Sequence, residues 1–272
     1  MDNLAPLFDK YSGALSLEQI STGISECIDN ALDLFGDAML LYDHKRYARA
    51  SSLLLTSLQE AGKVALLQQM GLLSSREQKQ WSRLWKHFRN HSEKDALGQS
   101  AKIARDAEEN PGEFFWQHLV YSRTIAPAKE KIRQFGQYVD FIKKDDKWWS
   151  PREVTSGIVD LVIDDVVAVL YKLYRAREIG LFSAPALLVY RKEFAAFRPA
   201  IELGKEYEIE DFGVRFFGLN GPYKRAWQKL IDQGILKNVP EDLFIMGKPW
   251  REWLMVREGE DLPKKSVDSD NR

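Results

Sequence analysis

Apolar residues recur along much of the chain at the spacing of an amphipathic helix. One such segment begins at Asp29, and a second occupies residues 47–69. Residues 43–45 are polar and separate the two segments, so the pattern predicts two antiparallel helices joined by a short turn. The apolar side chains that we expect in their shared core are Phe35, Ala50, Leu54 and Leu58.

The same periodicity continues further along the chain. Ser150 and Pro151 are typical of a helix start and Gly180 of a helix end, which predicts one long helix between them. Residues 206–217 alternate in hydrophobicity and predict a short strand or an irregular arm. The remaining helices are expected at residues 76–94, 113–122, 129–141, 185–197 and 223–233.

These elements predict an all-α fold. We expect a helical domain at residues 1–180, a mainly helical C-terminal extension at residues 181–260, and a disordered tail at residues 261–272. The tail is assigned from its lack of large apolar residues, which leaves it nothing to pack against a core.

Composition and charge narrow the class of protein. The chain has 272 residues, of which 44% are hydrophobic and 29% charged, and its formal net charge is −1, so RNA binding would need a local basic patch. The single cysteine, Cys27, excludes a disulfide framework. Because the N-terminus lacks the pattern of a secretory leader and no apolar run is long enough for a bilayer, we expect a cytoplasmic protein without a membrane partner.

The predicted helix at residues 76–94 carries the residues best suited to chemistry. Within about a quarter of its circumference lie Arg83, His87, Asn90, His91 and Lys94, opposite an aromatic stripe. A histidine beside cations is able to act as a general acid or base on a ribose 2′-hydroxyl, while the cations stabilise the phosphate. The alternative is a solvated polar face. No third ligand accompanies the two histidines at metal-binding spacing, so we expect no metal site.

A second polar stripe lies on the predicted helix at residues 47–69. It contains Arg49, Thr56, Glu60 and Lys63. Glu60 is a candidate for orienting a histidine or cation of the next helix, and the alternative is a structural ion pair with Lys63 one turn away.

Two other groups are interpreted as structural. Asp160, Asp164 and Asp165 suit a solvated helix face rather than a metal site, because no further oxygen ligands accompany them. Trp148 and Trp149 are able to stack on a nucleobase, but large aromatic residues more often anchor packing, so we expect them to hold neighbouring elements together.

Three segments resemble the AbiV family of phage abortive-infection proteins in the HEPN superfamily. They are the run KRYARASSLLLTSLQEAGKVALL at residues 45–67, FRNHSEK at residues 88–94, and IRQFGQYVDF at residues 132–141. The resemblance implies a HEPN-type helical bundle, a homodimer, and a role in stopping phage propagation. HEPN ribonucleases place a histidine further beyond an arginine–polar pair than this chain does, since Asp95 stands at that position and His91 comes earlier.

The residues and the resemblance together give the functional hypothesis. We expect an antiphage effector acting on RNA or translation, as a metal-independent endoribonuclease without a cofactor. The alternative is a non-enzymatic toxin that blocks a phage or translation-machinery protein. Expected partners are a second copy, RNA or a ribosome-associated target, and a phage-encoded activator. The candidate catalytic residues are His91, Lys94, Arg89 and Glu60, and the candidate substrate-binding residues are Arg46, Arg49, Lys63, Arg83 and His87.

Overall fold

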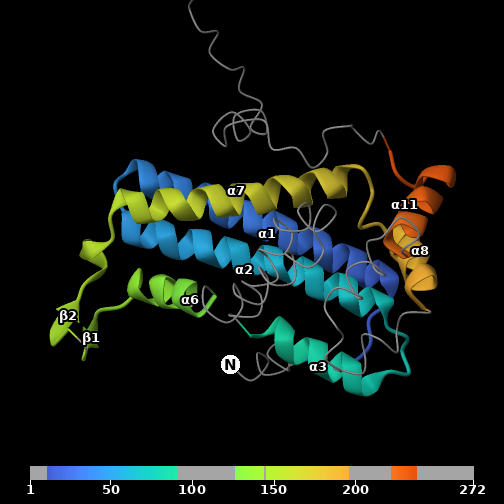
Figure 1. Cartoon of the computed structure of the whole chain (residues 1–272), viewed down its shortest axis with the longest axis horizontal. Coiled ribbons are helices and arrows are strands. Elements are labelled where there is room, and N and C mark those ends of the chain that lie inside the picture. Colours follow the sequence, from blue (N-terminus) through green and yellow to red (C-terminus); the bar gives the residue numbers. More distant parts are fainter. Residues whose placement is uncertain (1–10, 91–125, 144, 196–221, 238–272) are drawn as a thin grey trace, which may run out of the picture.

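Three long helices form the body of the protein in a computed structural model, which describes residues 11–90, 126–143, 145–195 and 222–237. Helix α1 (Leu17–Asp43), α2 (Tyr47–Leu72) and α7 (Ser156–Glu178) lie side by side (Figure 1). The predicted antiparallel pair is confirmed as α1 and α2. Its four predicted core side chains are all fully buried, namely Phe35, Ala50, Leu54 and Leu58.

Helix α1 begins earlier than its predicted start at Asp29. Ser16 caps the helix, because its hydroxyl accepts a hydrogen bond from the Gln19 backbone N–H at 3.2 Å. In return, the Gln19 side chain accepts one from the Ser16 N–H at 2.8 Å. This reciprocal capping box satisfies two backbone donors and fixes the start of the helix at Leu17.

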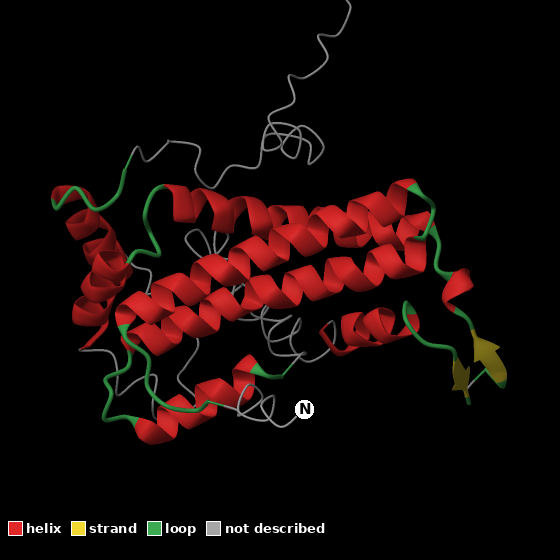
Figure 2. Ribbon diagram, turned by 180° about the vertical axis from the view of Figure 1, so that it is seen from behind, coloured by secondary structure: helices red, strands yellow, loops and turns green. Residues whose placement is uncertain are grey.

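Two shorter helices lie beside α2, below the three long helices in Figures 1 and 2. They are α3 (Gln78–Phe88) and α6 (Ala126–Phe135). Helix α3 matches the middle of the helix predicted at residues 76–94 and ends at Phe88. The helix predicted at residues 113–122 lies outside the described residues.

The helix predicted at residues 129–141 is wrong in its C-terminal part. Helix α6 ends at Phe135, and an antiparallel hairpin follows, with β1 (Asp140–Ile142) paired to β2 (Lys147–Trp149) and Phe141 opposite Trp148. The chain turns at Gly136, which packs directly on α2. A Cβ at this position would lie 2.4 Å from the Ala48 carbonyl oxygen, so only glycine allows this approach.

The predicted helix start at Ser150 is confirmed as a capping box but leads into a single turn. Ser150 and Glu153 cap each other around the 3₁₀ helix η3 (Pro151–Glu153). The chain then leaves helical geometry at Val154, whose side chain is buried, and α7 begins at Ser156. The predicted end is confirmed, since Gly180 adopts a φ of 89° just beyond α7.

Two further helices pack at the end of the bundle that lies opposite the hairpin (Figure 2). They are α8 (Ala184–Phe194) and α11 (Pro222–Asp232), which match the predicted helices at residues 185–197 and 223–233. Their side chains Leu187, Phe194 and Leu230 join the same buried cluster as α1 and α2. The predicted division after residue 180 stays a prediction.

The fold class is mainly helical, as predicted, with one small hairpin as its sheet among the described residues. Residues 206–217 and 261–272 lie outside the described part of the chain. None of the described helices combines the length and apolarity needed to cross a membrane.

Candidate functional site

Helix α3 presents its polar face to solvent because its aromatic face is anchored. Trp81 is fully buried, and its indole N–H donates a hydrogen bond to the Ser74 carbonyl oxygen at 2.9 Å. One turn later, the rings of Trp85 and Phe88 meet edge to face with centroids 5.3 Å apart. These three side chains occupy one side of the helix, so the opposite side is exposed.

The exposed side of α3 is basic. Arg76, just before the helix, and Lys79, Arg83 and Lys86 within it are all exposed. At 100° per residue they fall within one stripe, and α3 itself contains no acidic residue. Among the described residues, none of these four cations forms a salt bridge. We refer to this set as the α3 basic stripe.

Several cations elsewhere in the described part of the chain are neutralised by carboxylate partners. Lys129 lies 2.6 Å from Asp165, and Arg177 lies 2.6 Å from Asp29. The α3 basic stripe is therefore a local positive patch on a chain whose formal net charge is −1.

His87 lies beside this stripe and is half-buried. Its pKa is lowered, first by burial, which disfavours the charged ring, and then by the positive charges of Arg83 and Lys86. The Arg83 Nε–H points to His87 Nε2 at 3.4 Å, which is a long contact that a neutral ring accepts. The structure thus brings together two of the predicted substrate-binding residues, Arg83 and His87, and favours the neutral histidine.

Two of the three segments that resemble the AbiV family, residues 45–67 and 88–94, meet where Lys63 of α2 contacts Phe88 of α3. Lys63 Nζ lies 2.6 Å from Glu60 Oε1, and the same ammonium lies 5.1 Å from the centroid of the Phe88 ring. The ion pair is largely buried, with side-chain exposures of 19% for Lys63 and 14% for Glu60. Glu60 was considered either as a group that orients a histidine or cation of α3 or as the partner of Lys63 in an ion pair. Among the described residues, its contact is the ion pair with Lys63.

Arg89 has a different environment from the predicted phosphate-binding cluster. It is the C-cap residue of α3, its guanidinium donates a hydrogen bond to the Tyr11 carbonyl oxygen, and it lies 5.5 Å from the Trp85 ring centroid. The other two predicted catalytic residues, His91 and Lys94, lie outside the described residues.

Arg46 and Arg49 are exposed at the N-terminal end of α2, whereas Lys63 lies in its C-terminal half. With a rise of 1.5 Å per residue, the backbone of Arg46 is about 25 Å from that of Lys63. The five predicted substrate-binding residues therefore do not form one compact pocket. Lys63, Arg83 and His87 belong to the α2–α3 region, and the two arginines belong to the other end of the bundle.

Two of the three aspartates interpreted as structural have partners in the bundle. Asp160 accepts a hydrogen bond from the Tyr42 hydroxyl at 2.7 Å, and Asp165 pairs with Lys129, while Asp164 is exposed. Within the described ranges, no three His, Cys, Asp or Glu side chains gather closely enough to hold a metal ion.

The two tryptophans expected to be structural differ from each other. The Trp149 indole N–H donates to the Phe135 carbonyl oxygen at 3.2 Å and its ring packs on the Phe135 ring, as expected of an anchor. Trp148 is 68% exposed and contacts Phe141 across the hairpin. The expectation is therefore wrong for Trp148 as a packing anchor, because neighbouring strand residues point to opposite faces.

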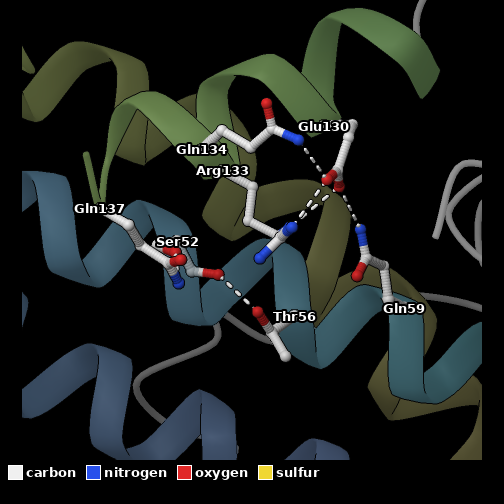
Figure 3. A network of polar contacts seen from close by, with 7 residues as sticks. All are labelled: Ser52, Thr56, Gln59, Glu130, Arg133, Gln134 and Gln137. Carbon is white, nitrogen blue, oxygen red and sulfur yellow. Dashed lines mark hydrogen bonds and ion pairs between the residues drawn. The ribbon is translucent and has the colours of Figure 1, made fainter. Parts of the chain in front are cut away.

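The structure contains a polar network between α2 and α6 that the sequence analysis did not predict (Figure 3). The Glu130 carboxylate accepts two hydrogen bonds from Arg133, at 2.6 and 2.9 Å, and one each from Gln59 and Gln134 at 3.0 Å. Burial opposes ionisation of Glu130, but the bonds from Arg133 and Gln59 and the charge of Arg133 outweigh it and lower the pKa to about 2. Only the three-residue spacing of Glu130 and Arg133 was visible in the sequence.

The comparison with known proteins supports the resemblance. A family model described as AbiV matches residues 19–160, which is more than half of the chain. No curated protein and no solved structure matches this sequence. The match includes all but the first two residues of α1, the whole of α2, α3 and α6, and the two segments that meet at Lys63 and Phe88. It points to an abortive-infection function of the HEPN type, and the chain belongs to the AbiV family of HEPN proteins.

Proposed function

We propose that this protein is an antiphage abortive-infection effector that acts on RNA in the cytoplasm, and that the α3 basic stripe contacts the RNA backbone. The observation that carries the proposal is the set of four exposed cations on and before α3, with no carboxylate partner among the described residues. From Lys79 to Lys86 the stripe extends about 10 Å along the helix, a length that matches a few successive phosphates of one strand.

The proposed reaction is metal-independent cleavage of RNA. His91 takes the proton of a ribose 2′-hydroxyl, the 2′-oxygen attacks the adjacent phosphorus, and the bond to the 5′-oxygen breaks. The products are a 2′,3′-cyclic phosphate and a 5′-hydroxyl, which takes its proton from water. Lys94 stabilises the negative charge that develops on the phosphate. Support comes from the chain order, because His91 lies three residues after Phe88, the last residue of α3, whose ring contacts Lys63 of the Glu60–Lys63 pair.

The binding step is tested by the salt dependence of affinity for single-stranded RNA. The plot of log Kobs against log salt has a negative slope, and each lost phosphate contact reduces the magnitude of that slope by about 0.7. We therefore expect Arg83→Ala and Lys86→Ala each to reduce the slope by this amount. The matched control is Lys131→Ala, which removes an exposed cation from α6. Slopes that stay unchanged in both α3 variants would contradict the proposed interface.

The chemical step is tested by sequencing RNA ends from phage-challenged cells that express wild type or His91→Ala. We expect new 2′,3′-cyclic ends with wild type only, and the same cleavage by purified protein in EDTA. The matched control is His44→Ala, because His44 is exposed in the turn between α1 and α2. If wild type and His91→Ala both protect cells and neither produces new RNA ends, the proposed ribonuclease activity is refuted.

A second candidate function is the non-enzymatic toxin that binds a phage or translation-machinery protein. The observation that favours it is the exposed apolar surface of the hairpin region, formed by Tyr138 (63%), Val139 (62%), Phe141 (43%) and Trp148 (68%). In this case Trp148→Ser would abolish protection while RNA ends stay unchanged. The matched control is Leu161→Ser, since Leu161 on α7 is 74% exposed.

A further inference from the structure

A short segment before α1 holds the C-terminal half of α3. The Trp85 indole N–H donates to the Gly13 carbonyl oxygen at 2.9 Å, and Arg89 donates to the Tyr11 carbonyl oxygen. The Tyr11 ring meets the Trp85 ring edge to face, with centroids 5.8 Å apart and planes at 88°. We refer to residues 11–14 as the N-terminal strap.

The strap has internal contacts of its own, and its C-terminal end is held by the bundle. The Tyr11 hydroxyl donates to the Ala14 carbonyl oxygen at 2.9 Å, which closes the segment on itself. A Cβ on Gly13 would lie 2.6 Å from the Tyr11 hydroxyl oxygen, so the turn is tight. Ala14 packs against the core, and the Ser16 capping box begins α1 immediately afterwards. Contacts to the strap therefore connect the end of α3 to the bundle.

Arg89 points to the strap and away from the basic stripe. Arg89 comes two positions after His87, which places the two side chains on nearly opposite sides of the helix. The Arg89 guanidinium lies over Trp85, on the aromatic side of α3, while Arg83 and Lys86 are on the exposed side. At the end of α3, the Arg89 guanidinium therefore donates to the Tyr11 carbonyl oxygen of the strap.

We propose that Arg89 and Trp85 are positioning residues: with the N-terminal strap, they hold the C-terminal end of α3, and Arg89 contacts no RNA phosphate. The inference rests on the proposed function for its consequence, because the proposed general base His91 follows this end of α3 in the sequence. The carbonyls of Tyr11 and Gly13 are the acceptors through which the strap holds the end of α3.

The experiment compares Arg89→Ala, Arg89→Lys and Trp85→Phe in the full chain. Amide hydrogen exchange of a peptide spanning residues 81–90 reports how firmly the end of α3 is held. Loss of one hydrogen bond corresponds to about a fivefold change in an equilibrium constant, so we expect about fivefold faster exchange in Arg89→Ala and in Trp85→Phe. Arg89→Lys should restore slow exchange, since an ammonium is able to donate to one carbonyl and lie over the same ring.

RNA binding and phage protection separate positioning from phosphate contact. We expect Arg89→Ala to keep the wild-type salt slope and lose protection, and Arg89→Lys to regain protection. A bidentate phosphate contact would not tolerate lysine in this way. A salt slope reduced in Arg89→Ala as much as in Arg83→Ala would overturn the inference, as would unchanged exchange in Arg89→Ala and Trp85→Phe.

The two proposals fail in different measurements. If Arg83→Ala and Lys86→Ala leave RNA binding unaltered, the proposed function is wrong, whereas the exchange data still decide whether the strap holds α3. Lys131→Ala serves as the control in both measurements, because it changes a cation that contacts neither the strap nor α3 among the described residues.

Discussion

Replacement of Glu130 by glutamine should destabilise the protein at neutral pH. The substitution keeps the shape of the side chain but removes the charge that Arg133 and Gln59 bind (Figure 3). The Glu130 pKa changes from 4.5 to about 2 on folding, and at about 1.4 kcal/mol per unit this sets a ceiling of about 3 kcal/mol. Because solvent screens part of this interaction, we expect a loss of about 1–2 kcal/mol in the free energy of unfolding.

The sign of the pH dependence follows from the lowered pKa. Above the unfolded value of 4.5, the folded state gains from the ionised carboxylate, and this gain disappears as the pH falls towards about 2. Urea unfolding of wild type and Glu130→Gln at pH 7 and pH 3 measures the effect. The difference between the two proteins should be largest at pH 7 and smaller at pH 3.

The matched control is Asp164→Asn, which removes an exposed carboxylate from α7. We expect its unfolding curve to stay close to that of wild type at both pH values. A Glu130→Gln protein as stable as wild type at pH 7, or a difference of equal size at pH 7 and pH 3, would show that the network between α2 and α6 does not stabilise the ionised form.

The remaining predictions concern the core, the ion pair and assembly. Leu58→Ala should lower the free energy of unfolding by about 2–5 kcal/mol, because Leu58 is fully buried, and an unchanged melting temperature would contradict the packing of α1 on α2. Glu60→Gln should cost about 1 kcal/mol by removing the partner of Lys63, and wild-type protection at equal expression would exclude a catalytic role for Glu60. Light scattering should report twice the mass of one chain if a second copy completes the site, and a monomer at micromolar concentration would argue against it.

Local sequence signals were sufficient for the positions of most helices. The 3.6-residue spacing of apolar residues identified α1 and α2, and the fully buried Phe35 and Leu54 confirm the predicted core face. The early start of α1 also had a local signal, since Ser16 and Gln19 form a capping box that can be read in the sequence. Such signals are local because they depend on backbone donors and side chains within one or two turns.

The end of α6 had a local signal in Gly136, because glycine is typical of a helix end, but the sequence did not show that the chain approaches α2 there. Gly136 breaks the helix where the chain meets the Ala48 carbonyl of α2, and that approach is decided by packing between elements far apart in the sequence. The polar network has the same origin. Gln59 is 98% buried on α2 and donates to Glu130 on α6, a pairing that no periodicity within either helix predicts.

For the candidate site, too, some features followed from the sequence and others only from the tertiary structure. The sequence by itself identified the basic and aromatic faces of α3, because both follow from residue spacing along one helix. Only the tertiary structure decided what the polar groups contact: Lys63 lies against Phe88, Arg89 against Tyr11, and Arg46 at the far end of α2. A side chain's face is set by its own helix, whereas its partner is set by the neighbouring element that packing places within a few ångströms.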